Sequence, residues 1–190
     1  RAKKSWEFMG LLEGFTLGTA IPGQLAEGEN GDIWQGQTGK LVRIQDLDRW
    51  PQASFTVFDR HHDIGQGEVR PVYIDGELIF MTTQGFKQFR DNTFHVDPRF
   101  NGRLNQEPVF RFADSPEHGA WVRFEEGTDA RLRKNTRDQY TIEGYPLSAL
   151  IPRKTYGLHI DIDGVVWVGR TSDLLRIEPY AETSTQIMQP

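Results

Sequence analysis

Two short stretches of the chain carry side chains that could do chemistry. The first is His61–His62 followed by Asp63, and imidazole and carboxylate groups are common metal ligands. Adjacent residues on an extended chain point to opposite sides and no third ligand stands at a metal-like spacing, so we expect an exposed loop pair and no metal site. The second stretch holds Asp161 and Asp163, a pair that resembles the two carboxylates of a glycoside hydrolase. Asp163 directly precedes a glycine, so a turn-forming hydrogen bond accounts for it better.

Three long loops hold the other candidate binding residues, and they cover residues 59–67, 97–107 and 143–154. Loops carried on a rigid scaffold are where binding residues concentrate. Basic side chains there could bind an anionic or sugar ligand through charge-assisted hydrogen bonds, and a tyrosine could stack on a sugar ring. The alternative for each residue is an ordinary solvated side chain. The candidate ligand-binding residues are His61, His62, Arg99, Arg103, Tyr145, Arg153 and Lys154.

Three tryptophans, Trp34, Trp121 and Trp167, suggest a carbohydrate-binding surface at first sight. Each of them stands inside a short run of β-branched and apolar residues, and the runs recur along the chain. A recurring position inside a strand is typical of a packing residue, so we expect these tryptophans to lie between sheets. The sialidase Asp-box also contains such a tryptophan, but its aspartate stands two places before the glycine, where this chain has Ile162.

The elements that must position these residues come from an internal repeat. Its anchoring glycines follow one another at steps of 45, 43 and 45 residues: Gly31, Gly76, Gly119 and Gly164. Around each glycine we expect four short strands, because β-branched and aromatic runs alternate with turn residues. Four strands in about 44 residues make the blade of a β-propeller. We therefore predict an all-β propeller fragment of about four blades, at residues 14–58, 67–97, 107–142 and 155–190, with an antiparallel sandwich as the alternative.

Composition limits the class of protein further. The net charge of −5 provides no basic surface for nucleic acid, and the absence of cysteine excludes disulfides, thiolate metal sites and a cysteine nucleophile. No apolar run reaches the ~18 residues of a membrane-spanning helix. The chain begins with Arg1 and shows no signal peptide, so we read it as one soluble piece of a longer protein.

The repeat resembles the two-component regulator propeller repeat, whose motif is D-x-x-G-x-[IVL]-W-x-G-x-x-x-G-L-x-R. The second and third copies match less well than the first and last. In the last copy the resemblance rests on Asp163, Gly164, Trp167, Gly169, Leu175 and Arg176. In the first copy it rests on Gly31, Trp34, Gly36, Gly39, Leu41 and Arg43.

This resemblance implies the extracytoplasmic sensing region of a membrane-anchored bacterial hybrid histidine kinase, or of a related receptor with a diguanylate cyclase output. The expected location is the periplasmic or extracellular side of the inner membrane. The expected ligand is a small molecule or an oligosaccharide, with no catalytic residues and no cofactor in this region. Family propellers have about seven blades, so we expect an open arc that associates with itself. The alternatives are a propeller enzyme resembling streptogramin B lyase and a structural arc for protein interactions.

Overall fold

The protein folds into four small antiparallel sheets with almost no helix. The computed structural model describes residues 25–115, 119–124, 128–144, 155–161, 163–170, 173–178 and 185–187. Within these ranges each sheet is a four-stranded meander whose neighbouring strands follow one another in sequence. This confirms the predicted all-β propeller of four blades.

The first two blades are fully described. The first blade consists of β1 (Leu25–Glu27), β2 (Ile33–Gln37), β3 (Lys40–Gln45) and β4 (Ser54–Phe58). The second consists of β5 (Arg70–Ile74), β6 (Glu77–Thr82), β7 (Gly85–Arg90) and β8 (Thr93–Val96). Two 3₁₀ turns, η1 (Leu47–Arg49) and η2 (Arg60–His62), lie in the links before and after β4.

The third and fourth blades repeat the same order. The third consists of β9 (Val109–Ser115), β10 (Gly119–Phe124), β11 (Asp129–Lys134) and β12 (Tyr140–Gly144). The fourth consists of β13 (Thr155–Ile160), β14 (Val166–Arg170), β15 (Leu174–Ile177) and β16 (Thr185–Ile187). One helical turn, α1 (Arg103–Gln106), lies in the link between the second and third blades, where no helix was predicted.

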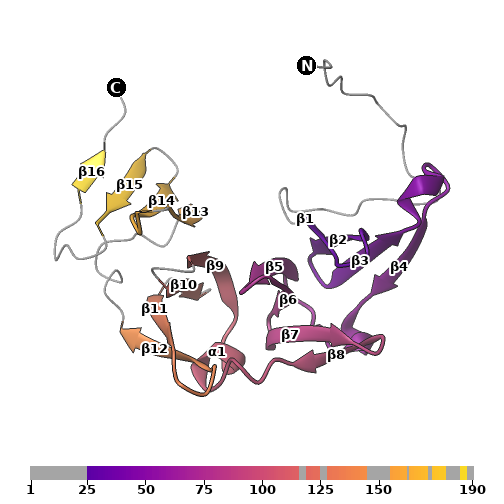
Figure 1. The fold of residues 1–190 in the computed structure, drawn as a ribbon, viewed down its shortest axis with the longest axis horizontal. Helices are drawn as coiled ribbons and strands as arrows, with labels where there is room; N and C mark the ends of the chain where they lie inside the picture. The colour runs from indigo at the N-terminus through magenta and orange to yellow at the C-terminus, as the bar shows by residue number, and fades with distance from the viewer. Residues whose placement is uncertain are drawn as a thin grey trace, which may run out of the picture.

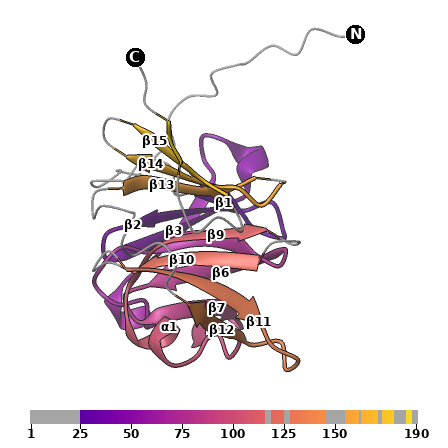
Figure 2. The same ribbon diagram turned by 90° about the vertical axis from the view of Figure 1, so that its left-hand side faces the viewer.

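The four blades form an arc with one open side (Figure 1). The first strand of each blade lines the inner side of the arc and the fourth strand its outer side. Turned by 90°, the last blade lies above the third in the view (Figure 2). The predicted open arc is therefore the arrangement of the described blades.

Three apolar cores join the blades in order. Trp34, Leu41 and Phe58 of the first blade pack with Phe80 and Phe94 of the second. The largest core joins the second blade to the third, and the link between them adds Phe100 and Leu104 to it. The third core joins the last two blades and contains Ala113, Trp121, Ile160, Val166, Val168, Leu175 and Ile177. Each blade thus buries one face against the next, because alternate residues of a strand point to opposite faces.

Tight turns between the first two strands of a blade explain the spacing of the anchoring glycines. Gly31, Gly76 and Gly164 have φ angles of 75°, 78° and 79°, a left-handed conformation in which a side chain is strained. Gly119 differs, because it is the first residue of β10 and pairs with Ser115. The third repeat therefore does not use its glycine as the turn residue, and the connecting residues 116–118 lie outside the described ranges.

The turn aspartate of the last blade is also different from the one expected. The carboxylate of Asp161, not that of Asp163, accepts hydrogen bonds from the backbone N–H groups of Asp163 and Val165, at 3.0 and 2.9 Å. Its second oxygen accepts the indole N–H of Trp167 at 2.7 Å. These bonds hold the pKa of Asp161 below its usual value, with the Trp167 bond as the largest cause. Asp161 is thus a turn aspartate of this blade, and the turn-forming hydrogen bond expected of the Asp163 side chain stays a prediction.

Candidate functional site

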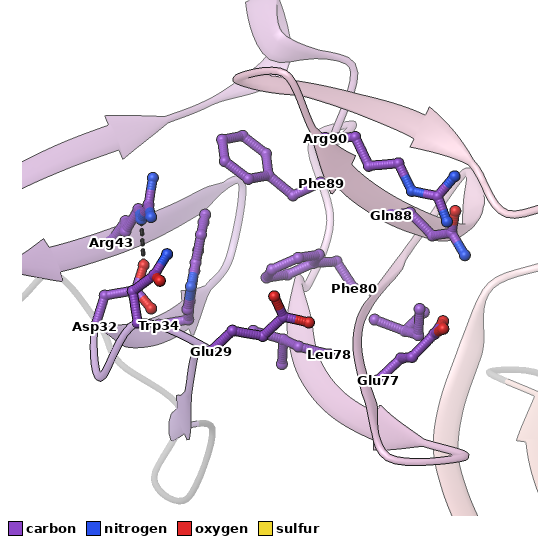
Figure 3. Close-up of a pocket in the computed structure, with 13 residues that line it drawn as sticks. Glu29, Asp32, Trp34, Arg43, Glu77, Leu78, Phe80, Gln88, Phe89 and Arg90 are labelled. Carbon is purple, nitrogen blue, oxygen red and sulfur yellow. Dashed lines mark hydrogen bonds and ion pairs between the residues drawn. The ribbon is translucent and has the colours of Figure 1, made fainter.

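A cavity of about 320 Å³ lies between the first and second blades. Its walls come from the β1–β2 turn and β2–β3 on one side, and from β6 and β7 on the other (Figure 3). The lining residues combine buried aromatic side chains with charged and amide groups. They are Gly28, Glu29, Asn30, Asp32, Trp34, Arg43, Glu77, Leu78, Ile79, Phe80, Gln88, Phe89 and Arg90.

The first-blade wall is built on Trp34, which is only 3% exposed. Arg43 lies opposite Trp34 in the β2–β3 register, and its guanidinium carbon stands 5.2 Å from the centre of the indole ring. The same guanidinium donates a hydrogen bond to the buried carboxylate of Asp32 (Figure 3). A cation held over an aromatic face and paired with a carboxylate is attracted to both. The Arg43 guanidinium and the Asp32 carboxylate therefore hold each other in place, and their opposite charges cancel within this wall.

Sequence differences between the first and last blades explain how Asp32 comes to stand there. In the last blade Asp161 supplies a carboxylate to Trp167, and Arg176 lies 5.7 Å from that indole ring. The first blade has Gly28 at the position of Asp161, and a side chain on Gly28 would collide with Asp32 Oδ1 and stand 2.9 Å from Trp34 Nε1. Asp32 thus fills the space beside the tryptophan that Asp161 fills in the last blade.

The second-blade wall is apolar where it faces Trp34. Phe80 is 1% exposed and its ring centre lies 4.9 Å from that of Trp34, while Phe89 meets Trp34 edge-on at 5.0 Å. Figure 3 shows these two rings facing Trp34, whereas Gln88 and Arg90, which alternate with Phe89 along β7, point away from it. Glu29 of the first blade extends toward Phe80 and supplies a polar group at the opening.

Glu77 is the rim residue that connects the cavity to a wider ion-pair network. Its side chain is 55% exposed, and Arg99 Nη2 lies 2.9 Å from Glu77 Oε2. Arg99 also pairs with the buried Asp97 at 2.8 Å and lies 3.6 Å from Asp75. Burial opposes the charge of Arg99, but the hydrogen bond to Asp97 and the charges of Asp97, Glu77 and Asp75 together outweigh it and raise the pKa of Arg99.

Asp75 completes that network between the second and third blades. Lys134 Nζ lies 2.8 Å from its carboxylate, and the Tyr140 hydroxyl donates to it at 2.9 Å. Desolvation favours the neutral form of Asp75, but these two hydrogen bonds and the charges of Lys134 and Arg99 together outweigh it and lower the pKa of Asp75. Arg99, which the sequence suggested as a ligand-binding residue, is thus held by carboxylates of the chain itself. Its side chain is only 12% exposed.

The predicted histidine pair lies in η2, between the first two blades. The carboxylate of Asp59 accepts the backbone N–H of His61 at 2.9 Å and lies 3.0 Å from His62 Nδ1. The two rings are exposed and form part of a capped turn. Among the described residues, no group of three or more His, Cys, Asp or Glu side chains is arranged to hold a metal ion.

Arg103 lies apart from the histidine pair, in α1. It pairs with Glu107 at 2.7 Å, and its guanidinium carbon stands 4.4 Å from the ring centre of Phe124. Tyr145, Arg153 and Lys154 fall outside the described residues. The proposed ligand-binding roles of all seven loop residues therefore remain predictions.

The cavity lies at the other end of the blades from the predicted loop 59–67, although Arg99 of the loop 97–107 reaches its lining residue Glu77. The expected meeting of the β2–β3 turn with the first inter-blade loop is present, because Thr38 bridges to Glu68 and Gly39 N donates to Gly67 O at 2.7 Å. The cavity instead opens near the β1–β2 turn and the start of β6. The cavity was not predicted from the sequence, because the candidate residues were chosen from the long loops between blades. The available signal was the recurrence of an arginine opposite a strand tryptophan at Arg43 and Arg176.

Comparison with known proteins gives a fold and no family. No protein-family model matches the chain, and no curated protein matches it either. The solved extracellular domain of BT4673 from B. thetaiotaomicron, named a hybrid two-component system, superposes with a TM-score of 0.63 at 16% identity. A second structure of BT4673, named a one-component system, gives a TM-score of 0.52 at 14% identity. The likeness establishes the fold.

Coverage is unequal in these comparisons. The first match covers 86% of this chain and 24% of the BT4673 chain, and the second covers 87% and 31%. The chain thus spans about a quarter to a third of the structures that it resembles. Within the described residues no helix is long and apolar enough to cross a membrane.

Proposed function

We propose that this chain is a non-catalytic ligand-sensing module of the extracytoplasmic part of a bacterial two-component receptor. It binds a small polar molecule or an oligosaccharide and passes the effect of binding to a kinase or cyclase output domain. The observation that carries the proposal is the cavity between the first two blades, with its aromatic floor and polar rim.

The chemistry of the cavity favours a ligand with one apolar face and several hydroxyl or amide groups. Trp34, Phe80 and Phe89 provide ring surface, and rings of this kind pack against apolar ligand faces. Glu29 and Asn30 of the β1–β2 turn provide donors and acceptors beside it. Because Arg43 and Asp32 already pair with each other, the site does not need a charged ligand.

The location of the cavity suits a sensor. It lies between two blades, so a ligand that contacts both changes the free energy of their relative packing. The named role of the BT4673 domains, as extracellular parts of signalling systems, supports the same type of function and an extracytoplasmic location. No described cluster of His and acidic side chains converges on the cavity, so we propose binding without catalysis.

Titration of the protein with a panel of neutral and acidic oligosaccharides, followed by tryptophan fluorescence and calorimetry, tests this function. Trp34 forms a wall of the cavity, so a bound ligand should change its emission. Replacing Glu29, whose side chain extends toward Phe80 across the cavity (Figure 3), with glutamine should weaken binding about 5- to 100-fold, the loss of one hydrogen bond to a charged group.

The matched control is Glu143→Gln. Glu143 is an exposed glutamate of β12 in the third blade and does not line the cavity. This variant should bind as the wild type does. Equal weakening by both substitutions, or no binding by any member of the panel, would contradict the proposed site.

A further inference from the structure

The β1–β2 turn of the first blade and the β13–β14 turn of the last blade have the same backbone hydrogen bonds. In the first blade, Gly28 N donates to Asp32 O at 2.6 Å. In the last blade, Asp161 N donates to Val165 O at 3.1 Å. In each turn, the glycine three places after the first residue donates to the carbonyl of that residue at 3.0 Å. The two turns therefore correspond residue by residue, with Gly28 at the place of Asp161.

In the last blade, one side chain satisfies three N–H groups around the turn. The Asp161 carboxylate accepts the backbone N–H groups of Asp163 and Val165 at 3.0 and 2.9 Å. It also accepts the indole N–H of Trp167 at 2.7 Å. The three donors thus point to one place, and a carboxylate of the chain itself lies there.

The first blade has the same three donors but no side chain at the corresponding place. The N–H groups belong to Asn30, Asp32 and Trp34, and Gly28 has no side chain to meet them. Within the described ranges, no group accepts a hydrogen bond from any of the three. All of these residues line the cavity, and Trp34 is only 3% exposed. The three donors are therefore available to a ligand in the cavity.

One acceptor stands among these donors. Asp32 Oδ2 accepts from Arg43, and the other oxygen, Oδ1, faces Gly28. A Cβ on Gly28 would collide with Oδ1 and stand 2.9 Å from Trp34 Nε1, so one small group can reach both atoms. Figure 3 shows Asp32 beside the Trp34 ring. We call this part of the cavity, formed by Gly28, Asn30, Asp32 and Trp34, the Gly28 notch.

We propose that the Gly28 notch binds a hydroxyl group of the ligand, an inference that rests on the ligand-sensing role proposed for the cavity. The hydroxyl oxygen accepts the indole N–H of Trp34 and the backbone N–H of Asn30. The hydroxyl proton is donated to Asp32 Oδ1. The rest of the ligand then lies along the rings that line the cavity.

A hydroxyl fits these partners better than a charged group does. It accepts and donates at a single oxygen, whereas a carboxylate only accepts and an ammonium only donates. A ligand carboxylate is repelled by the carboxylate of Asp32, and a ligand ammonium is repelled by the guanidinium of Arg43. The notch therefore selects neutral polyols and sugars over acidic and amino-bearing ligands.

The first test compares three probes that share a six-membered ring: cyclohexanol, cyclohexanecarboxylate and cyclohexylammonium. Each is titrated into nitrogen-15-labelled protein, and the indole N–H signal of Trp34, assigned with Trp34→Phe, is followed by NMR. Cyclohexanol should bind at least ~10-fold more tightly than the other two probes, because it alone both accepts and donates in the notch. No movement of the Trp34 signal with cyclohexanol, or equal affinity for a charged probe, would overturn the proposal.

The second test rebuilds the last-blade turn in the first blade with the double substitution Gly28→Asp and Asp32→Val. Gly28 has no positive φ, and the chain already folds such a turn at Asp161, so the circular dichroism should stay that of the wild type. The introduced carboxylate should shift the Trp34 signal before any probe is added and weaken cyclohexanol binding at least ~10-fold. Undiminished binding by the folded double variant would refute the notch as the hydroxyl site.

The third test uses Asp32→Asn, which keeps the size of the side chain and removes its charge. Cyclohexanecarboxylate should gain affinity relative to cyclohexanol, because the repulsion is gone. An equal loss for all three probes would show that Asp32 only supports the wall, and the proposal would fail. Asp91→Asn, at an exposed turn aspartate that does not line the cavity, is the control and should leave all three affinities unchanged.

The oligosaccharide panel separates this inference from the proposed function. If members of the panel bind the wild type and the double variant equally, the sensor function stands and the notch is refuted. If cyclohexanol binds as expected and no oligosaccharide does, the notch is supported and the proposed function is contradicted.

Discussion

Asp129 should make the stability of the protein fall as pH rises. Asp129 opens β11, is 1% exposed, and has a single described counter-charge, Arg123 Nη1 at 3.7 Å. Burial raises its pKa from 3.8 to about 6, against the pull of Arg123. The folded state therefore holds a proton that the unfolded state releases, so stability is highest below the unfolded pKa and is lost as pH rises to the folded one.

The magnitude follows from the size of that shift. Each pKa unit corresponds to ~1.4 kcal/mol, so the rise from 3.8 to about 6 predicts a loss of about 3 kcal/mol across this window. Asp129→Asn cannot ionise, so its free energy of unfolding should lack this decline. The variant also leaves Arg123 without its carboxylate partner, which lowers stability at every pH but does not restore the slope.

Urea unfolding of both proteins at a series of pH values, from below the unfolded pKa to above the folded one, measures the two slopes. Asp91→Asn is the control, because Asp91 is an exposed turn aspartate and asparagine tolerates its positive φ of 50°. It should keep the wild-type decline. Parallel curves for the wild type and Asp129→Asn would refute the assignment of the decline to this buried carboxylate.

Three further predictions concern packing, the last-blade turn and the anchoring glycines. Phe100→Ala should lower the free energy of unfolding in urea by about 3–5 kcal/mol, because Phe100 is 1% exposed and stacks on the rings of Phe86 and Tyr140. Phe55→Ala should lower the same free energy far less, because Phe55 is 37% exposed. The wild type should lose stability as pH falls through the lowered pKa of Asp161, because protonation breaks the bonds that this carboxylate accepts. Asp161→Asn should show no such loss, and acid titrations followed by Trp167 fluorescence compare the two proteins. Gly76→Ala should lower the stability measured by thermal unfolding by ~1–2 kcal/mol, because Gly76 has a φ of 78°. Gly157→Ala should lower it less, because Gly157 has no positive φ and no atom lies near its added Cβ. Equal losses of stability in the two variants would contradict the strain argument.

The repeat explains how much of the fold could be predicted from the sequence. β4 and β8 lie where the runs SFTVF and TFHV predicted them, because each is a short apolar run between turn residues. The helical turn α1 was not predicted, since four residues carry too little periodicity to recognise. The tryptophans were predicted as packing residues, and Trp34 and Trp121 do lie in cores between blades.

The candidate site was less accessible to prediction. Glu29 and Glu77 stand far apart in sequence and belong to no loop of notable length, yet both line the cavity between two blades. The sequence also could not show that Arg99 would reach back to Glu77 and Asp75, since a long side chain can point into solvent or along the sheet. Only the packing of one blade on the next decided these contacts.

The sequence by itself determined the repeating unit, its strands and its turn glycines, because these depend on residues close together in the chain. Only the tertiary structure decided which faces meet and which side chains share a space. Asp32 stands beside Trp34 because Gly28 leaves room for it, a choice that no local pattern records. The cavity likewise arises between blades, where contacts depend on distance in space and not along the chain.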